Sequence, residues 1–327
     1  MGLVFERLPP VEQCTTIARL AHRWRAWAEP RRAAARARAL PVSRFVAGLA
    51  ATSAAVGPMP PAWSVREAWP RLTPSQRTIA ALRAAAAGDL AELRWMLGPG
   101  RCPRSASICE AAAIGGHLDA LVYAREAGCP WDVATCRQAA ENGHLNVLRY
   151  AHQAGCRWDA LVCQLAATHG HVDVLRYAHE HGCPWNVSTC DGAARNGHVA
   201  ALGYAHEHGC PWDHRTCMAA AEGGHLAALR YAREAGCPWK GYTCWLAAEN
   251  GHLDVLRYAH EHGCPWDEKT CAAAAGGGHL RVLRYARGAG CPWDAAACRR
   301  LAQFGGFIDI VEWIDGQEGG LKQEEVP

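Results

Sequence analysis

The chain has 327 residues, of which half are hydrophobic and a fifth are charged, so it can bury a sizeable core and is not a disordered polyelectrolyte. Its formal charge of +3 is too small to indicate nucleic-acid binding. The longest uncharged apolar run, residues 45–60, is shorter than the roughly 20 residues that a membrane span needs. The first thirty residues show no basic start followed by an apolar stretch. We therefore expect a cytoplasmic protein that binds neither nucleic acid nor a membrane.

Residues 1–30 are expected to form a turn followed by a short helix. Leu8 and Pro9 mark the turn, and Arg23-Trp24-Arg25 and Trp27 end the helix. This arrangement resembles the later part of an F-box, although the opening Leu-Pro segment of that family has no counterpart here. The resemblance implies contact with the adaptor of a cullin-type ubiquitin ligase through Leu8, Pro9, Trp24 and Trp27. The alternative is an amphipathic helical cap, because short motifs often match by chance.

A linker, a repeat array and a tail follow in chain order. Residues 31–72 are rich in Ala, Arg and Pro, which is typical of a linker. The sequence Thr73-Pro74-Ser75-Gln76 then predicts a capping box with Pro at the first helical position. We expect an array of about nine helix pairs over residues 73–315 and a disordered tail over residues 316–327.

A 27-residue repeat dominates the array. Seven Trp residues, from Trp131 to Trp293, recur at this interval, and a Gly-His step and two Cys recur in the same register. In the copy over residues 132–158, a capping Asp precedes Cys, Ala and Gly at i, i+3, i+4 and i+7 spacing, which predicts a short helix with a narrow face. A second helix of about ten residues follows Gly143, and Gly155 ends it. Such a hairpin buries its apolar face only in a stack, so we expect an all-α solenoid.

The repeat also resembles a known family. The motif Ala-Ala-x-Asn-Gly-His-Leu-x-Val-Leu-Arg-Tyr-Ala-x-Glu-x-Gly is similar to the core of the ankyrin repeat, over about residues 74–315. The shorter period implies an ankyrin-like α-solenoid without long β-hairpin fingers. It looks like the Gly-Cys-Pro-Trp-Asp type found in large DNA viruses and algae, and a viral source would place it in the host cytoplasm. The resemblance implies a non-enzymatic scaffold that binds another protein. With a working F-box, it would be a substrate receptor of a cullin-type ubiquitin ligase.

The third, sixth and tenth positions of each copy vary, whereas core positions are nearly constant. The three variable positions lie about 100–160° around the first helix from the core Cys, so they are expected on the concave side of the stack. Tyr242 and Trp245 are expected to face solvent, and Trp, Tyr and Arg are the residue types that dominate interface energies. The alternative explanation for the variation is that these are surface positions whose sequence drifts because nothing constrains it. The predicted partner-binding residues are Arg137, Gln164, Asp191, Arg215, Met218, Tyr242, Trp245 and Lys269.

The repeated Cys and His residues raise the alternative of a metal- or redox-linked protein. Each copy offers two Cys seven residues apart and a His eight residues after the second, such as Cys129, Cys136 and His144. Zinc sites usually contain a close Cys pair, and no Cys-x-x-Cys occurs in the sequence. We therefore favour Cys as a small core residue and His as a hydrogen-bonding residue between neighbouring hairpins. Because no catalytic motif is found, we expect no enzyme, no cofactor and no metal, and a monomer.

Overall fold

The computed structural model describes residues 62–321 of the chain. Every regular element in that range is helical, with 19 α-helices, one 3-10 helix and no strand, which confirms the all-α expectation. The chain divides into two compact units, residues 1–135 and 136–327, and the boundary falls inside helix α9 (Val133–Glu141). The F-box-like residues Leu8, Pro9, Trp24 and Trp27 lie outside the described residues.

Unit 1 contains two helix pairs after a short helical segment. As the sequence predicts, Thr73 and Gln76 form a capping box, in which each side chain accepts a hydrogen bond from the other residue's backbone N–H. The elements are α4 (Ala62–Ala68), the 3-10 helix η2 (Trp69–Arg71), the pair α5 (Pro74–Ala87) and α6 (Leu90–Met96), and the pair α7 (Ala106–Gly115) and α8 (Leu118–Glu126).

The predicted linker is wrong at its C-terminal end, where α4 and η2 pack on the array. Val65, Trp69 and Leu72 are buried and follow i, i+4 and i+7 spacing, an apolar stripe that the Ala, Arg and Pro content concealed. The Trp69 ring meets the ring of Trp95 edge-on, with centroids 5.1 Å apart. This segment therefore shields the outer side of α6 from water.

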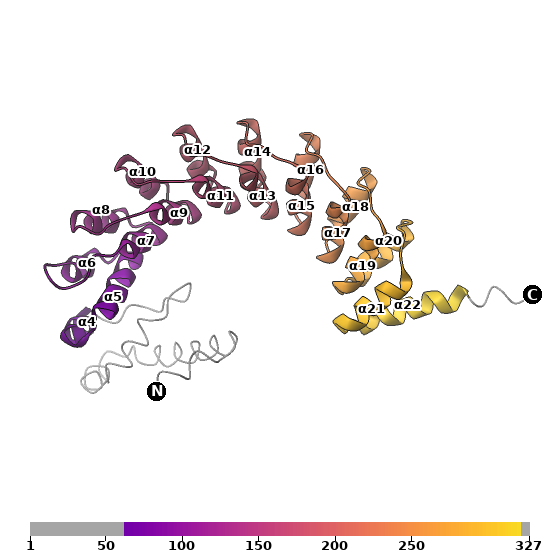
Figure 1. Ribbon diagram of the computed structural model, residues 1–327, viewed down its shortest axis with the longest axis horizontal. Coiled ribbons are helices and arrows are strands. Elements are labelled where there is room, and N and C mark those ends of the chain that lie inside the picture. Colours follow the sequence, from indigo (N-terminus) through magenta and orange to yellow (C-terminus); the bar gives the residue numbers. More distant parts are fainter. Residues whose placement is uncertain (1–61, 322–327) are drawn as a thin grey trace, which may run out of the picture. The chain divides into compact units, whose positions relative to one another are not determined.

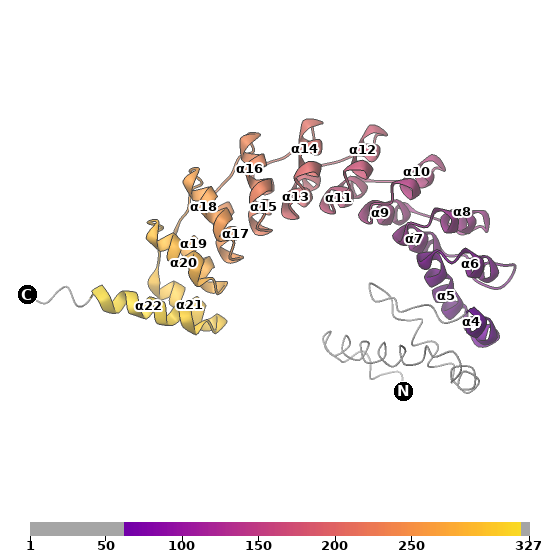
Figure 2. The same cartoon turned by 180° about the vertical axis from the view of Figure 1, so that it is seen from behind.

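Unit 2 consists of two rows of helices (Figure 1), and the view from behind gives the same order (Figure 2). Neighbouring first helices pack more closely than neighbouring second helices do, so the first-helix row is the concave side of this unit. The first-helix row is α11 (Ala160–Thr168), α13 (Val187–Arg195), α15 (His214–Glu222), α17 (Tyr242–Glu249), α19 (Glu268–Gly276) and α21 (Ala295–Gly305). The second-helix row is α10 (Leu145–Gln153), α12 (Val172–Glu180), α14 (Val199–Glu207), α16 (Leu226–Glu234), α18 (Leu253–Glu261), α20 (Leu280–Gly288) and α22 (Ile308–Leu321).

The array ends later than the sequence predicts. Helix α22 continues to Leu321, six residues beyond the expected end at residue 315. Ile310 and Ile314 are buried in its first turns, and the helix continues through three glycines, at 316, 319 and 320, each of which costs about 1 kcal/mol. From α5 to α22 the described residues hold nine helix pairs.

The first helices of unit 2 begin at side-chain caps. An Asp or Asn side chain accepts the N–H of a residue two or three positions later, at 2.8–3.2 Å. Each such cap stabilises its helix by about 1 kcal/mol. The capping residues are Asp159, Asn186, Asp213, Asp267 and Asp294. Helix α17 is the exception, because Lys240 stands at this position and Gly241 caps the helix without a side-chain bond.

The repeated Gly-His step joins each pair to the next. Gly143 ends the first helix with a φ of 75°, a left-handed conformation that glycine adopts without strain. A Cβ at Gly143 would lie 2.6 Å from the ring of His171, so the imidazole can stack there only on glycine. The Nε2 atom of His171 lies 3.1 Å from the carbonyl oxygen of Glu141. The expected hydrogen bond between neighbouring hairpins is therefore confirmed.

The Cys and Ala residues let the first helices approach closely. All 16 cysteines among the described residues are buried and unbridged, in line with their interpretation as small core residues. The Sγ of Cys183 donates to the carbonyl oxygen of Asp159 at 3.2 Å, and burial raises the pKa of Cys298 to about 11. Residues 62–321 contain no group of three or more His, Cys, Asp or Glu that could hold a metal ion. None of the described helices is both long and apolar enough to cross a membrane.

Candidate partner-binding groove

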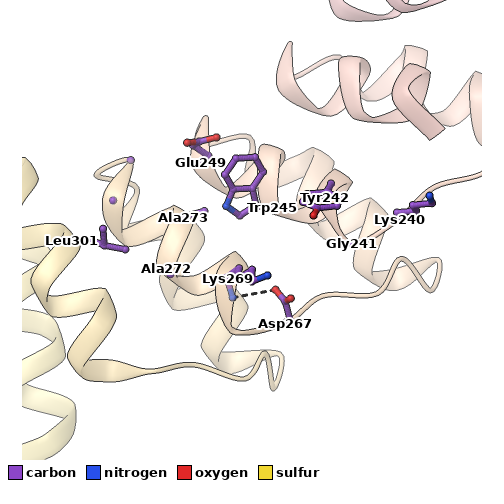
Figure 3. A pocket seen from close by; sticks show the side chains of 12 residues that line it. Lys240, Gly241, Tyr242, Trp245, Glu249, Asp267, Lys269, Ala272, Ala273 and Leu301 are labelled. Atoms are coloured by element: carbon purple, nitrogen blue, oxygen red, sulfur yellow. Dashed lines mark hydrogen bonds between the residues drawn. The ribbon is translucent and has the colours of Figure 1, made fainter. Parts of the chain in front are cut away.

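A groove of about 790 Å³ opens on the concave side of unit 2, across helices α17, α19 and α21 (Figure 3). We call it the inner groove. Its walls carry aromatic, aliphatic and charged side chains, and its floor is made of small residues. The walls are Lys240, Tyr242, Trp245, Glu249, Asp267, Lys269 and Leu301; the remaining lining residues are Gly241, Ala272, Ala273, Gly276 and Gly277.

The groove exists because one helix has smaller side chains than its neighbours. The exposed side of α19 carries Ala272, Ala273 and Gly276, whereas α17 and α21 carry Trp245 and Leu301. A Cβ at Gly276 would lie in ordinary contact with Leu301, 3.7 Å from its Cβ. A bulky residue on α19 would therefore fill the space between the two walls.

Tyr242 and Trp245 form the aromatic wall. They are one turn apart on α17, and their rings meet edge-on with centroids 6.4 Å apart, the neighbour relation that i, i+3 spacing predicts. The Tyr242 side chain is 56% exposed. Trp245 is half-buried instead of fully solvent-facing, because it leans toward α19 and lines the groove. The pair thus offers apolar area while remaining accessible.

The charges are unevenly distributed around the groove. Lys240 and Lys269 lie near the N-terminal ends of α17 and α19, and Glu249 lies at the C-terminal end of α17. These three residues take part in none of the ion pairs found among residues 62–321. The backbone N–H of Lys269 donates to the carboxylate of Asp267, which lines the same end of the groove. One end of the groove therefore carries two lysines and one carboxylate, Asp267, and the other carries Glu249.

Two of the predicted partner-binding residues instead pair with their neighbours on the same row. Arg137 pairs with Asp159, and this bond holds the pKa of the Asp159 carboxyl below its usual value. Arg215 pairs with Asp213 at 3.2 Å. Both arginines share the concave side with the groove but do not line it.

Three other predicted residues are also outside the groove. Asp191 accepts a hydrogen bond of 2.8 Å from the hydroxyl of Thr216, and burial raises its pKa. Gln164 and Met218 are half-buried on α11 and α15. The structure therefore brings together only Tyr242, Trp245 and Lys269 of the predicted set.

Two wall residues outside the predicted set, Leu301 and Lys240, depart from the residue that other copies of the repeat have at the same position. Leu301 stands at the eighth position of its copy, where the preceding copies have a buried Ala such as Ala274. Lys240 stands at the first position, where the neighbouring copies have Asp213 and Asp267. Both positions are nearly constant in the other copies, so variation among copies does not identify them.

Comparison with known proteins gives a structural match but no matching family model. No family model matches the chain, and no curated protein matches it. Among solved structures, the crystal structure of the human ASB11 ankyrin repeat domain matches with a TM-score of 0.42 and 16% sequence identity, over 48% of this chain and 84% of that one. The ankyrin-like architecture described here stands on the helix pairs and Gly-His stacks themselves.

Proposed function

We propose that the protein is a non-enzymatic interaction scaffold that binds a segment of a partner protein in the inner groove. The observation that carries this proposal is the loss of a structural residue at the groove. Lys240 replaces the capping Asp or Asn that five neighbouring first helices use, so α17 forgoes about 1 kcal/mol of stability. Residues that break a local rule without a folding benefit tend to occur at functional sites.

The partner segment should carry an apolar anchor. A half-buried Trp and an exposed Tyr offer a large contact area with few rotatable bonds, which is why such residues dominate interface energies. The small-residue floor on α19 gives the anchor room between Trp245 and Leu301. We expect a large aliphatic or aromatic side chain there.

The partner segment should also carry acidic residues on one side of the anchor. The ammonium groups of Lys240 and Lys269 attract carboxylates toward one end of the groove, and Glu249 repels them from the other. This asymmetry fixes the direction in which the segment binds.

A peptide-display library panned against the full chain tests this proposal. We expect enrichment of peptides with an apolar anchor flanked by Asp or Glu on one side, and loss of their binding in Trp245→Ala. Met218→Ala is the matched control, because Met218 holds the same repeat position on α15 but lies outside the groove. Peptides that bind both variants equally would place the site elsewhere.

The ligase role is a more specific form of the same proposal. The Leu8-Pro9 turn and the Arg23-Trp24-Arg25 motif support it by their resemblance to an F-box. In that case the protein is a cytoplasmic substrate receptor, and the ubiquitin-ligase adaptor should co-purify with the full chain. Trp24→Ala should weaken that association and leave peptide binding in the groove intact. Recovery of groove-bound peptides without any adaptor would leave the scaffold function and remove the ligase role.

A further inference from the structure

Glu249 is the acidic residue at the end of the inner groove opposite Lys269 (Figure 3). It is exposed on the last turn of α17, and it takes part in none of the ion pairs found among residues 62–321. The same repeat position forms an ion pair in the two preceding copies, because Arg195 on α13 pairs with Glu222 on α15. The neighbours of Glu249 at that position are Glu222, which is already paired, and Gly276 on α19. The carboxylate of Glu249 is therefore accessible to a cation from a partner.

Gly276 leaves open space next to Glu249. It is exposed at the end of α19, and its backbone does not have the positive φ that favours glycine. A Cβ at the following residue, Gly277, would lie 2.3 Å from the carbonyl oxygen of Glu249, so the ends of the two helices are in close contact. A Cβ at Gly276 would instead lie in ordinary contact with Leu301, so a side chain would fit there. Glycine at 276 thus opens the groove where the other copies of unit 2 carry a longer side chain.

The two ends of the groove are about 10 Å apart. Lys269 is the second residue of α19 and Gly276 is its last, and each residue between them adds a rise of about 1.5 Å. An extended chain advances about 3.3 Å per residue, so about three residues cover the same distance. A segment that lies along the groove therefore has side chains three or four positions apart at its two ends.

The groove is too narrow for a helix of the partner. Helix α19 forms the floor and packs between α17 and α21, which carry the walls. Packed helices lie about 8–10 Å apart, so the axes of α17 and α21 are separated by about 20 Å at most. Their own side chains take up about 10 Å of this distance, and a helix with its side chains is about 10–12 Å wide. The backbone of an extended chain needs only about 5 Å, so an extended segment fits.

We propose that the inner groove selects an extended segment of mixed charge, with an acidic and a basic residue three or four positions apart and the apolar anchor between them. The acidic residue meets Lys240 and Lys269. The basic residue occupies the space above Gly276 and pairs with Glu249. Glu249 determines specificity, because it repels a second acidic residue at that end of the groove. This selectivity rests on the binding function proposed above for the groove.

Peptide-display libraries panned separately against the full chain and its Glu249→Lys variant test this selectivity. For the wild type, we expect enriched peptides with Arg or Lys three or four positions from Asp or Glu. For Glu249→Lys, we expect Asp or Glu at the position that held the basic residue. Glu141→Lys is the matched control, because Glu141 holds the same repeat position on α9 and lies outside the groove. Its enriched peptides should match those of the wild type.

A synthetic peptide from the wild-type selection measures the contribution of the pair with Glu249. Replacement of its basic residue by Gln should weaken binding to the wild type about threefold in a fluorescence anisotropy titration, an ordinary effect for an exposed ion pair. The same replacement should leave the affinity for Glu249→Gln unchanged. Equal weakening in both proteins would mean that the basic residue does not pair with Glu249.

Gly276→Arg supplies the missing cation from within the chain. Because a side chain fits at this position, circular dichroism should show unchanged helicity. The new guanidinium should pair with Glu249 and remove the preference for a basic residue in the peptide. Gly276→Ala adds a Cβ without a charge, so it should keep that preference.

Failure of the selectivity and failure of the binding function give different results. If no enriched peptide loses binding in Trp245→Ala, the groove is not the binding site. If peptides that depend on Trp245 carry no basic residue, or are the same for Glu249→Lys, the groove binds a partner but the mixed-charge selectivity is wrong. A basic residue about seven positions from the acidic one would indicate a helical segment and would overturn the extended conformation.

Discussion

Two stretches of the concave side of unit 2 have the same backbone but opposite surface chemistry. On α13 and α15, polar side chains satisfy one another, as Arg195 does with Glu222 and Asp191 with Thr216. Across α17, α19 and α21, aromatic, aliphatic and lysine side chains surround a floor of small residues. The repeat therefore fixes the helices and leaves each copy free to differ in what it presents. We expect a binding site where the side chains on the concave side no longer pair with one another and remain accessible to a partner.

The shared backbone should depend on the Gly-His stacks in both stretches, and this prediction has the largest expected effect. Gly197→Ala places a Cβ about 2.6 Å from the ring of His225 at a φ of 74°, so it combines a clash with left-handed strain. We expect the free energy of unfolding to fall by about 3 kcal/mol in urea denaturation. Gly209→Ala has similar φ and open space, and it should cost only about 1 kcal/mol. If both variants lose the same amount of unfolding free energy, the Gly-His stack does not contribute to stability.

The difference between the stretches should appear next in binding. Trp245→Ala removes the central apolar side chain of the inner groove and should weaken a library-selected peptide about 30-fold, or about 2 kcal/mol, in a fluorescence anisotropy titration. Arg195→Ala, on the internally paired stretch, should change the affinity by less than about twofold. If instead Trp245→Ala unfolds the array while the folded fraction keeps its affinity, Trp245 is a core residue.

A smaller effect should appear with pH on the second-helix row. His152 stacks on Trp158 with centroids 3.8 Å apart and faces the Tyr177 hydroxyl and the His181 ring. Burial, and secondarily the nearby His181, lowers the pKa of His152 below its ordinary value of about 6.5. Burial likewise lowers the pKa of His179. Stability should therefore be full above that value and fall as the pH drops below it, because the unfolded chain binds more protons.

The repeat supplies its own control for this pH effect. Arg233 occupies the position of His152 in another copy and stacks on Trp239 with its guanidinium carbon 4.1 Å from the ring centroid. Because arginine stays protonated, the free energy of unfolding of His152→Arg should fall less between pH 7.5 and pH 5.5 than that of the wild type. An unchanged slope would assign the acid sensitivity to other groups.

The fold was predictable from the sequence because the same structural residues recur at the same spacing in each copy of the repeat. A glycine, a histidine and a small-residue face at fixed spacing admit few structures other than stacked helix pairs. The α4 segment escaped prediction because Val65, Trp69 and Leu72 occur once, within a composition typical of linkers. A pattern that occurs only once cannot be recognised by its repetition along the chain.

The site was predictable only in part, for a related reason. Variation among copies identified Tyr242, Trp245 and Lys269, but it could not show that Arg137, Arg215 and Asp191 are engaged with their neighbours. That distinction depends on side-chain distances, within a copy for Arg215 and between neighbouring copies for Arg137 and Asp191. Leu301 and Lys240 could have been identified in a different way, because each replaces a residue that is nearly constant in the other copies. The predicted site residues were instead taken from positions that vary among copies.

Substitution of Lys240 tests the central claim most directly, because it separates stability from recognition. Lys240→Asp restores the cap of the neighbouring copies and removes a positive charge from the inner groove. We predict that its free energy of unfolding rises by about 1 kcal/mol while its affinity for the acidic, library-selected peptide falls several-fold. Lys240→Ala, which removes the charge without restoring the cap, should lose affinity without gaining stability. A Lys240→Asp protein that binds the peptide as tightly as the wild type would contradict the account.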